Sequence, residues 1–514
     1  METLAREIGF SLTGDYNASR LLWDNLDTNS ERRAILSDSG DFTYGQLAVE
    51  AAKVGNVLLQ AGCKPRERIL LFLNDEPAYP AAIMGALRAG FVPVLINTLT
   101  PPDLIRYCLQ DSSATAAVVS EDHADLFIQE TVKGTACHTV IATANGQPWA
   151  AMEPDLPEYP TTATDMAFWM YSSGSTGKPK GVVHKHEDAL YTAWSYARHI
   201  LNINKDDICF SVPKIFFAYG FGNSISFPMS VGAASVLMAA RPDPTLIYEH
   251  INRYRPTLFF GLPTLYNALI RAESIEQKDL SSVRLCISAA EVLSEEIAKA
   301  WRDQFGHAII EGLGSTELLH IYLSNTEREQ KSGAAGKPVP GYAVRLETAE
   351  GLEARAGEEG VMVVCGLSGA QYYWDRPQNT AETMRKGWIH TGDRFICDHD
   401  GFYFFRGRAD DLVKVSGQWV YPLEIELVLN EHPMVATSCV QALELADKRL
   451  TIVAWVVPAA AVMLNAQFKK DLQDYTKQML LPHKYPREII FLQELPKTGT
   501  GKSDRQLLKG GYGG

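Results

Sequence analysis

The sequence predicts an α/β protein, with doubly wound sheets and a β subdomain in a large N-terminal domain and a small α+β C-terminal domain. Three observations lead to this prediction. The chain has 514 residues, more than one hydrophobic core usually organises. Apolar runs alternate with helical patterns through most of the chain, and shorter alternating segments follow after about residue 340. Apolar residues make up 46% of the chain and charged residues 21%, as in an ordinary globular protein.

The alternation is clearest near the N-terminus. Residues 68–73 are apolar, residues 76–89 have helical spacing and residues 91–96 are apolar again, which is the pattern of a βαβ unit. Further apolar runs, most of them separated by helical patterns, lie at residues 116–119, 208–212, 234–238, 257–260, 284–287 and 308–310. This alternation predicts parallel sheets covered by helices.

The pattern also predicts where the domains divide. Short alternating segments such as residues 360–365 indicate an antiparallel β subdomain at about residues 340–408. The segment 407–411 then precedes a last stretch that contains two helical patterns. We therefore place an N-terminal domain at residues 1–408 and a C-terminal domain at residues 409–514.

Charge and composition exclude several classes of protein. A net charge of −13 disfavours a general nucleic-acid surface. The first residues lack the pattern of a secretory signal, and the longest apolar stretch, at residues 451–464, is broken by Pro458 and is shorter than the roughly 20 residues of a spanning helix. Eight scattered cysteines without a Cys-x-x-Cys are expected to be buried in a reducing cytoplasm. We expect a cytoplasmic protein that acts on small molecules, without nucleic-acid or membrane partners, as a monomer or a homodimer.

One loop carries the strongest local signal. Residues 172–181 read Ser-Ser-Gly-Ser-Thr-Gly-Lys-Pro-Lys-Gly and connect an apolar strand at 167–171 to a helical pattern at 187–200, a position where loops bind ligands. Its glycines let the backbone approach an anion, and its hydroxyls and lysines suit a triphosphate. The expected phosphate-binding residues are Ser172, Ser173, Gly174, Ser175, Thr176, Gly177, Lys178 and Lys180.

Other phosphate and serine motifs fit this loop poorly. A Walker loop needs glycine where Ser172 stands, and Pro179 follows Lys178. A Ser-x-x-Lys hydrolase is a second alternative, because Ser175 and Lys178 have that spacing and a Lys-Thr-Gly begins at Lys497. The chain lacks Ser-Asp-Asn, and Pro179 follows where that serine should open a helix. A non-catalytic nucleotide-binding module is a third alternative.

The loop and four later motifs resemble, in order and spacing, those of the superfamily of acyl-CoA synthetases, peptide-synthetase adenylation domains and luciferases. The later motifs are Gly314-Ser-Thr-Glu317, Thr391-Gly-Asp393, Gly407-Arg-Ala-Asp-Asp411 and Pro496-Lys-Thr-Gly-Thr-Gly-Lys502. The resemblance covers nearly the whole chain. It implies an enzyme that joins a carboxylate to AMP and transfers the acyl group to a thiol, using ATP, Mg²⁺ and coenzyme A.

The resemblance also implies roles for single residues. Lys502 would bridge the carboxylate and the α-phosphate during adenylation, and Lys502 argues against a non-catalytic module. Glu317 would hold Mg²⁺ together with Thr176. The other implied nucleotide contacts are Thr316, Ser288, Ala289, Ala290, Glu291, Glu311, Gly312, Asp393 and Arg408. Ala290 departs from the family, whose members usually carry glycine there.

In this superfamily the C-terminal domain swings between the two half-reactions. Asp410 matches the hinge position. Lys414 matches the segment that is brought to the site for thioester formation, and the other residues of that segment are Ser416, Gly417 and Trp419. Gly417 would let pantetheine pass.

The acid that is activated is indicated by residues 214–230. This segment contains no Asp or Glu, whereas peptide-synthetase domains hold an amino acid's ammonium there with Asp. With residues 314–325 and 414–420, it closely resembles benzoate-CoA and hydroxybenzoate-CoA ligases. The residues that match the aryl pocket are Phe217, Ala218, Tyr219, Gly314, His320 and Ile321.

Flat aromatic walls favour a planar ring, and His320 is placed to meet a ring substituent or the carboxylate. The resemblance therefore implies an aryl-CoA ligase, with a ligase for a biosynthetic starter acid such as aminobenzoate as the alternative. The choice among benzoate, hydroxy- and aminobenzoates and heteroaromatic acids such as furoate stays open. Lys214 receives no catalytic role and is expected to lie buried against a carboxylate.

Overall fold

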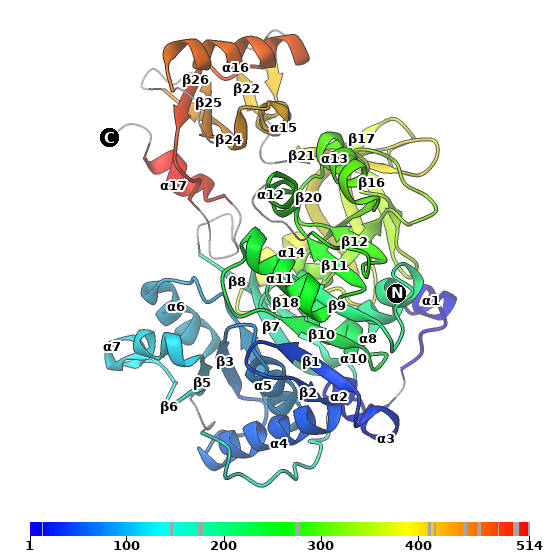
Figure 1. Ribbon diagram of the computed structural model, residues 1–514, viewed down its shortest axis with the longest axis vertical. Helices are drawn as coiled ribbons and strands as arrows, with labels where there is room; N and C mark the ends of the chain where they lie inside the picture. The colour runs from blue at the N-terminus through cyan, green and yellow to red at the C-terminus, as the bar shows by residue number, and fades with distance from the viewer. Residues whose placement is uncertain are drawn as a thin grey trace.

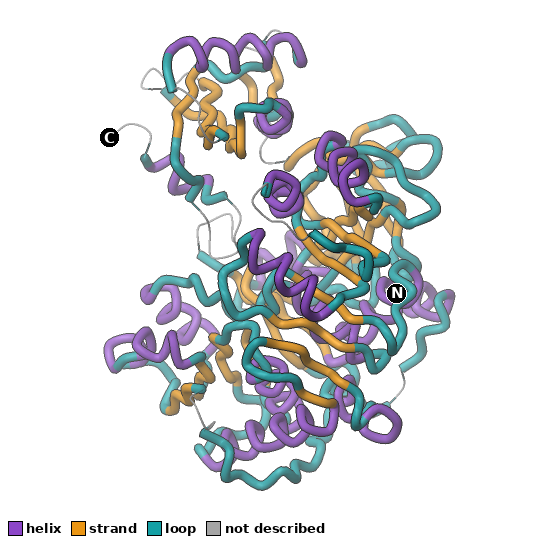
Figure 2. The backbone as a smooth tube through the Cα atoms, in the orientation of Figure 1, coloured by secondary structure: helices purple, strands orange, loops and turns teal. Residues whose placement is uncertain are grey.

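The computed structural model describes the chain through residue 511, except for residues 13, 144–147, 173–177, 273–277, 410–412, 416–417, 446–449, 460–463, 482 and 497–502. It contains two large sheets, a smaller antiparallel sheet and a group of C-terminal strands. The strands of the large sheets run through the middle of the larger body, and helices lie outside them (Figure 2). The predicted α/β fold class is confirmed.

The first large sheet is built around the predicted βαβ unit. Its order is β18-β8-β7-β4-β3-β5-β6, parallel from β7 to β6 and antiparallel at β8 and β18. The strands are β3 (Arg68–Phe72), β4 (Val92–Leu95), β5 (Ala116–Val119), β6 (Thr139–Ala142), β7 (Met166–Ser172), β8 (Lys180–Lys185) and β18 (Tyr372–Tyr373). The helices of this part are α4 (Tyr44–Gln60), α5 (Ala78–Arg88), α6 (Pro102–Ser112), η1 (Glu121–Phe127) and α7 (Gln129–Val132). Helix α5 connects β3 to β4, which pair in parallel, as the sequence predicts.

The second large sheet has the order β15-β14-β13-β12-β11-β9-β10-β1-β2. It is parallel from β13 to β1, with antiparallel strands at both edges. The strands are β1 (Arg33–Ser37), β2 (Phe42–Thr43), β9 (Ile208–Ser211), β10 (Ala234–Leu237), β11 (Leu258–Gly261), β12 (Leu285–Ser288), β13 (Ile309–Gly314), β14 (Ile321–Ser324) and β15 (Lys337–Pro338). Each predicted apolar run from 208 to 310 overlaps one of these strands.

Helices connect and cover these strands. They are α1 (Glu2–Glu7), α2 (Arg20–Trp23), α3 (Leu26–Asn29), α8 (His186–Thr192), the π-helices η2 (Ala193–Arg198) and η3 (Gly222–Ser226), α9 (Ala218–Phe221), α10 (Phe227–Met229), α11 (Pro244–Tyr254), α12 (Pro263–Arg271), α13 (Glu295–Phe305), the 3₁₀ turn η4 (Thr316–Leu318) and α14 (Pro377–Thr383). No helix in the described part of the chain combines the length and the apolar character needed to cross a bilayer.

The segments after residue 340 form the antiparallel sheet that the sequence predicts. It consists of β16 (Ala343–Glu347), β17 (Glu359–Cys365), β20 (Trp388–Cys397), β19 (Met384–Arg385) and β21 (Tyr403–Arg408). The C-terminal part follows with β22 (Val413–Val415), β23 (Gln418–Val420), α15 (Pro422–Glu431), β24 (Val435–Glu444), β25 (Leu450–Pro458), α16 (Ala466–Met479), β26 (Glu488–Phe491) and α17 (Arg505–Gly510). It has its own buried apolar clusters, and Figure 1 shows its sheet and helices to one side of the larger body.

The structure corrects one prediction. The loop at 172–181 does not lead directly into a helix, because strand β8 pairs antiparallel with β7 and places Lys180 opposite Ser172. Helix α8 begins only at His186. The lysines at the two ends of β8 resemble loop sequence, whereas Val182 and Val183 between them are fully buried. The described ends of the loop, Ser172 and Lys180, therefore belong to two paired antiparallel strands.

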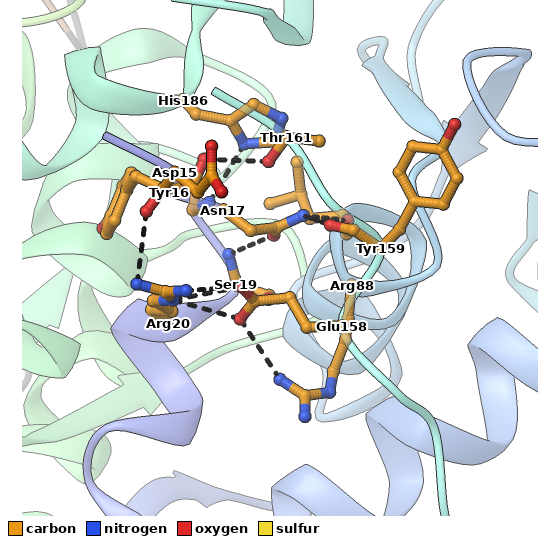
Figure 3. A network of polar contacts seen from close by, with 12 residues as sticks. Asp15, Tyr16, Asn17, Ser19, Arg20, Arg88, Glu158, Tyr159, Thr161 and His186 are labelled. Carbon is orange, nitrogen blue, oxygen red and sulfur yellow. Dashed lines mark hydrogen bonds and ion pairs between the residues drawn. The ribbon is translucent and has the colours of Figure 1, made fainter. Parts of the chain in front are cut away.

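The N-terminal segment ties the larger body together (Figure 3). The buried Asn17 amide donates to the Leu87 carbonyl oxygen at the end of α5 (2.9 Å). The next backbone N–H, that of Ala18, donates to His186 Nδ1 (3.0 Å), so this ring nitrogen must carry no proton. Burial lowers the pKa of His186 to about 4, which agrees with a neutral ring. His186 is thus held by the N-terminal segment.

Candidate active site

Two of the predicted nucleotide motifs lie where neighbouring parallel strands of the second sheet end. Residues 288–291 begin at the last residue of β12, and the motif Gly314–Glu317 begins at the last residue of its neighbour β13. Ligands of open α/β sheets bind at this edge. Among the described residues, the buried hydroxyls of Ser172, Ser288 and Ser315 have no hydrogen-bond partner. Unpaired buried hydroxyls suit a site that a polar ligand completes.

Residues outside the Thr316–Leu318 turn hold it in place through hydrogen bonds to its carbonyl groups. The Glu317 carbonyl oxygen accepts from the Ala370 N–H (2.8 Å), and the Leu318 carbonyl oxygen accepts from the Ser368 hydroxyl (2.9 Å). The next residue, Leu319, has φ of +65°, a conformation that costs a side-chain-bearing residue energy and persists where its surroundings enforce it. The turn is therefore rigidly placed.

Tyr373 joins two predicted nucleotide ligands. Its hydroxyl donates to Glu317 Oε1 (2.8 Å), and Lys180 Nζ lies 4.1 Å from the centre of its ring. Burial lowers the pKa of Lys180, and the nearby Glu317 carboxylate opposes this. Tyr373 thus contacts a carboxylate through its hydroxyl group and a lysine through its ring. Tyr373 was not among the predicted site residues.

A second missed group supports the end of the phosphate loop. The Tyr107 hydroxyl donates to the Pro179 carbonyl oxygen (3.0 Å), and its ring lies 5.3 Å from Lys178 Nζ. Arg376 donates to both the Tyr107 hydroxyl and Asp111 Oδ1 (2.7 Å each). Residues 173–177, which contain five of the predicted phosphate ligands, lie outside the described residues.

The predicted nucleotide contacts Asp393 and Arg408 lie opposite each other on β20 and β21. Asp393 pairs with Arg408 in the strand register, and Asp393 Oδ1 lies 3.3 Å from Arg408 Nη1. Arg408 also donates to the Thr391 carbonyl oxygen (3.1 Å). Gly392, between Thr391 and Asp393 in the chain, has φ of +74°, and a Cβ there would lie 3.1 Å from the Arg408 guanidinium. The structure brings the predicted pair together.

The predicted nucleotide contact Glu311 is a partly buried carboxyl group on β13. Glu311 Oε1 accepts from the Leu293 N–H (3.1 Å), and burial raises the pKa of Glu311 to about 8. Gly312 next to it packs closely on β14, because a Cβ there would lie 2.9 Å from the Ile321 side chain. These residues shape the end of β13.

Ala290 has φ of +71°, in the left-handed region that costs an alanine roughly 1 kcal/mol. We expect Ala290→Gly to stabilise the protein by about 0.5 kcal/mol, because the relief of strain exceeds the added entropy of the unfolded chain. Ala290→Val should destabilise it by more than about 1 kcal/mol, because a β-branched residue tolerates this backbone poorly. Urea unfolding of both variants measures the two effects. Equal unfolding of Ala290→Val and the wild type would contradict the left-handed backbone.

The predicted aryl-pocket residues come from two segments that meet. Phe217, Ala218 and Tyr219 stand at the start of α9, and His320 and Ile321 at the start of β14. The Tyr219 and His320 rings are 5.5 Å apart. This contact brings the two predicted walls together.

His320 is enclosed in an aromatic and polar environment. Its ring lies 4.4 Å from Phe227 and 5.3 Å from Tyr196, and its Nε2 is 3.2 Å from Asn223 Oδ1. Burial lowers the pKa of His320 to about 3, so the ring is neutral at physiological pH. His320 can therefore contribute a hydrogen bond or a ring contact, but no positive charge.

Two glycines make this arrangement possible. A Cβ on Gly222 would lie 2.2 Å from the His320 ring, and one on Gly314 would lie 2.6 Å from the His320 carbonyl oxygen. Gly314 was predicted as a pocket residue, and it pairs with Ile321 across β13 and β14. The ring of His320 is thus pressed against backbone on one side.

Lys214 lies close to a carboxylate, as expected. Its ammonium donates to the Met238 and Ala240 carbonyl oxygens (Ala240, 3.1 Å). Burial lowers the pKa of Lys214, and Asp75 opposes this. Burial raises the pKa of the fully enclosed Asp75 to about 6. The Lys214 hydrogen bonds connect the substrate segment to the residues after β10, and the Ile215 N–H donates to Asp75 Oδ1 (3.2 Å) in the loop after β3.

Several C-terminal predictions lie outside the described residues. These are the hinge Asp410, the thioester residues Ser416 and Gly417, and Lys502. Lys414 and Trp419 face each other in the β22–β23 register, but only their backbone is described. The structure neither assembles nor separates this part of the predicted site.

The described residues fit a divalent cation that a nucleotide brings with it. They contain no group of three His, Cys, Asp or Glu that could hold a metal ion, so the protein alone offers no closed cage there. Glu317 presents a partly exposed carboxylate, with one oxygen bonded to Tyr373. One protein carboxylate plus substrate phosphates is the usual way in which Mg²⁺ is bound.

Comparison with known proteins identifies the class of enzyme to which this site belongs. Residues 22–374 match the family model of AMP-binding enzymes, and residues 424–502 match that of the AMP-binding enzyme C-terminal domain. The chain therefore belongs to the AMP-binding enzyme family. The predicted membership is confirmed, and the Ser-x-x-Lys hydrolase alternative falls away.

Several individual proteins are similar to this chain over nearly its whole length. The chain is 40% identical to a benzoate–CoA ligase of Thauera aromatica, over 96% of both chains. It is 36% identical to a 4-hydroxybenzoate–CoA/benzoate–CoA ligase of Rhodopseudomonas palustris, over 96% of this chain and 94% of that one. A crystal structure of a benzoate CoA ligase from Burkholderia xenovorans LB400 matches with a TM-score of 0.89 at 36% identity, over 96% and 100% of the two chains. The anthranilate CoA ligase AuaEII in complex with anthranoyl-AMP matches with a TM-score of 0.91 at 32% identity, over 97% and 98%.

Proposed function

We propose that the protein is an AMP-forming aromatic acid–CoA ligase. The observation that carries this proposal is the contact between the rings of Tyr219 and His320, whose centres are 5.5 Å apart. His320 lies three residues after Glu317, which belongs to the nucleotide motif. An aromatic-walled site next to a phosphate site suits a planar acid that reacts with ATP. The 40% identity to a benzoate–CoA ligase supports the same substrate class.

The reaction consists of two displacements. A carboxylate oxygen bonds to the α-phosphorus of ATP and the bond to pyrophosphate breaks, which gives aroyl-AMP. The thiol sulfur of CoA then bonds to the acyl carbon, AMP leaves, and the thiol proton passes to solvent. Both steps concentrate negative charge, so cationic groups that face the reacting oxygens lower the barriers.

The described residues supply a surface for ATP in this scheme. Thr316 and Glu317 would face the phosphates, and Asp393 with Arg408 would bind the ribose. Mg²⁺, when bound, neutralises charge on the phosphates, and Glu317 would hold it. Lys178 and Lys180 would meet the departing pyrophosphate. Together these groups favour the first displacement.

The second displacement needs a different arrangement of the C-terminal part. We place the boundary between residues 408 and 409, with Asp410 as the hinge between two orientations. Lys502 would serve adenylation, and Lys414 would serve thioester formation. The separate apolar clusters of the C-terminal part support its movement as one body.

An aminobenzoate is the second candidate substrate. It is favoured by the similarity to the anthranilate CoA ligase complex. The neutral His320 is compatible with an uncharged ring amine or with an unsubstituted ring. Substrate preference must therefore be measured.

A pyrophosphate-release screen tests the function. Benzoate, hydroxy- and aminobenzoates, furoate and aliphatic acids are each supplied with ATP, with and without CoA. We expect release with one or more aromatic acids, and aroyl-CoA and AMP when CoA is present. Release with aliphatic acids alone would contradict the aromatic substrate class.

Ala218 offers a test of the pocket wall. We expect Ala218→Gly to raise the kcat/KM for ring-substituted benzoates, relative to that for benzoate, by about 10-fold. Ala218→Val should lower this ratio by about the same factor. The reason is that one methyl group is worth about 1–3 kcal/mol in such pockets. Steady-state kinetics across a panel of ring-substituted benzoates measure the ratios. Unchanged ratios in both variants would remove Ala218 from the pocket.

A further inference from the structure

A buried histidine and aspartate lie directly behind the Thr316–Glu317 turn. His184 is near the end of β8, Asp188 is in the first turn of α8, and both side chains have 0% exposure. His184 Nδ1 is 3.0 Å from Asp188 Oδ2, and His184 Nε2 is 2.8 Å from the Thr316 carbonyl oxygen. The nucleotide motifs contain neither His184 nor Asp188.

Both ring nitrogens of His184 have a polar partner, one on a carboxylate and one on a backbone carbonyl. A carbonyl oxygen can only accept a hydrogen bond, so the Nε2–H group of His184 donates to Thr316. Asp188 Oδ2 also accepts from the Lys185 N–H (3.0 Å), and Asp188 Oδ1 lies 3.3 Å from Lys185 Nζ. Asp188 thus connects the ring to the start of α8.

The rest of the cluster is also hydrogen-bonded. Lys185 Nζ donates to Glu187 Oε1 (2.6 Å) and to the Leu367 carbonyl oxygen (2.9 Å). The Lys185 ammonium and two carboxylates thus lie together with the His184 ring under the turn. A buried charge is retained at such a place only when it is paired and hydrogen-bonded.

The bond from His184 fixes one specific peptide. The Thr316 carbonyl belongs to the peptide that joins Thr316 to Glu317, so its direction sets where both side chains point. The next two carbonyls of the turn accept from the Ala370 N–H and the Ser368 hydroxyl. Of the three donors, only the His184 ring is itself held by a carboxylate, that of Asp188 (3.0 Å), which fixes the orientation of the ring.

We propose that His184 and Asp188 form a positioning pair for adenylation: the buried imidazole ring holds the Thr316–Glu317 peptide so that the Thr316 hydroxyl and the Glu317 carboxylate face the phosphates of ATP. This inference rests on the proposed function. Both side chains of the pair are fully buried, so the pair acts through the turn.

The chain provides a matched control. His186 is two residues further on and is also buried, with 2% exposure. Its Nδ1 accepts from the Ala18 N–H, so it belongs to the N-terminal network of Figure 3. His186→Gln should perturb stability without affecting the turn.

The test compares His184→Gln, Asp188→Asn, the double variant and His186→Gln. Pyrophosphate release with the best aromatic acid reports adenylation, and CoA-thioester formation from supplied aroyl-AMP reports the second step. We expect His184→Gln to lower the kcat of pyrophosphate release by about 10- to 100-fold, with the KM for the acid and the second step changed by less than about 3-fold. His186→Gln should leave both half-reactions at the wild-type level.

The double variant tests the chain of hydrogen bonds. The asparagine amide can donate to the glutamine carbonyl, and the glutamine amide can then donate to the Thr316 carbonyl, which restores the chain of bonds. We expect it to recover at least about 5-fold of the rate lost in His184→Gln. If His184→Gln alone does not fold, the double variant is compared with Asp188→Asn instead, and the double variant should again be the faster of the two.

Three outcomes would overturn the positioning pair: an unchanged rate in His184→Gln, an equal loss in both half-reactions, or an equal loss in His186→Gln. A double variant no faster than His184→Gln would also overturn it. Failure of the proposed function looks different, because the wild type itself would then release no pyrophosphate with any aromatic acid.

Discussion

Replacing Lys502 with alanine is expected to lower aromatic-acid-dependent pyrophosphate release by about 10²- to 10³-fold. Negative charge builds up on the carboxylate and α-phosphate oxygens as they approach each other, and the lysine ammonium would stabilise both. The same variant should still form aroyl-CoA from supplied aroyl-AMP at close to the wild-type rate, because the second step no longer needs that charge. Separate assays of the two half-reactions measure the difference.

Lys414→Ala is the matched control for Lys502. Lys414 lies on β22, in a different stretch of the C-terminal part, and is expected to serve thioester formation. Its replacement should slow the second half-reaction and spare pyrophosphate release. Equal loss of both half-reactions in either variant would contradict a division of labour between the two lysines.

Much of the fold could be predicted from local sequence. Apolar runs such as residues 92–95 and 258–261 are buried strands, and the pattern alone locates them to within one or two residues. Other strands, such as β1, β6 and β14, were not predicted, and at β8 only Val182 and Val183 mark a strand. A two-residue apolar signal between lysines and glycine does not distinguish a strand from a loop.

The candidate site was predictable only where motifs mark it. Asp393 and Arg408 meet across one hairpin, so their pairing follows from local sequence. Tyr373 reaches Glu317 across 56 residues and His184 reaches Thr316 across 132. The spacing of apolar and polar residues along the chain does not predict contacts between residues so far apart in sequence. The one available signal is the four-residue spacing of His184 and Asp188, which also occurs on ordinary helix faces.

Glu317 is expected to have the second largest effect. Glu317→Gln removes the negative charge but keeps a carbonyl oxygen that can accept from the Tyr373 hydroxyl, so the turn should stay in place. We expect pyrophosphate release to fall by about 10²-fold at limiting Mg²⁺, with a higher Mg²⁺ concentration needed for half-maximal rate. Thioester formation from supplied aroyl-AMP, which breaks no phosphoanhydride bond, should change little. Rates measured across a Mg²⁺ titration test this expectation.

Tyr373→Phe separates the charge of Glu317 from its placement. The variant keeps the carboxylate and the ring that lies 4.1 Å from Lys180, but it removes the hydroxyl that holds Glu317 Oε1. We expect a loss of about 10-fold in pyrophosphate release, with the Mg²⁺ concentration for half-maximal rate shifted less than in Glu317→Gln. If both variants had the wild-type Mg²⁺ dependence, Glu317 would not hold the cation. Its effect on rate would then have to come from the position of the turn alone.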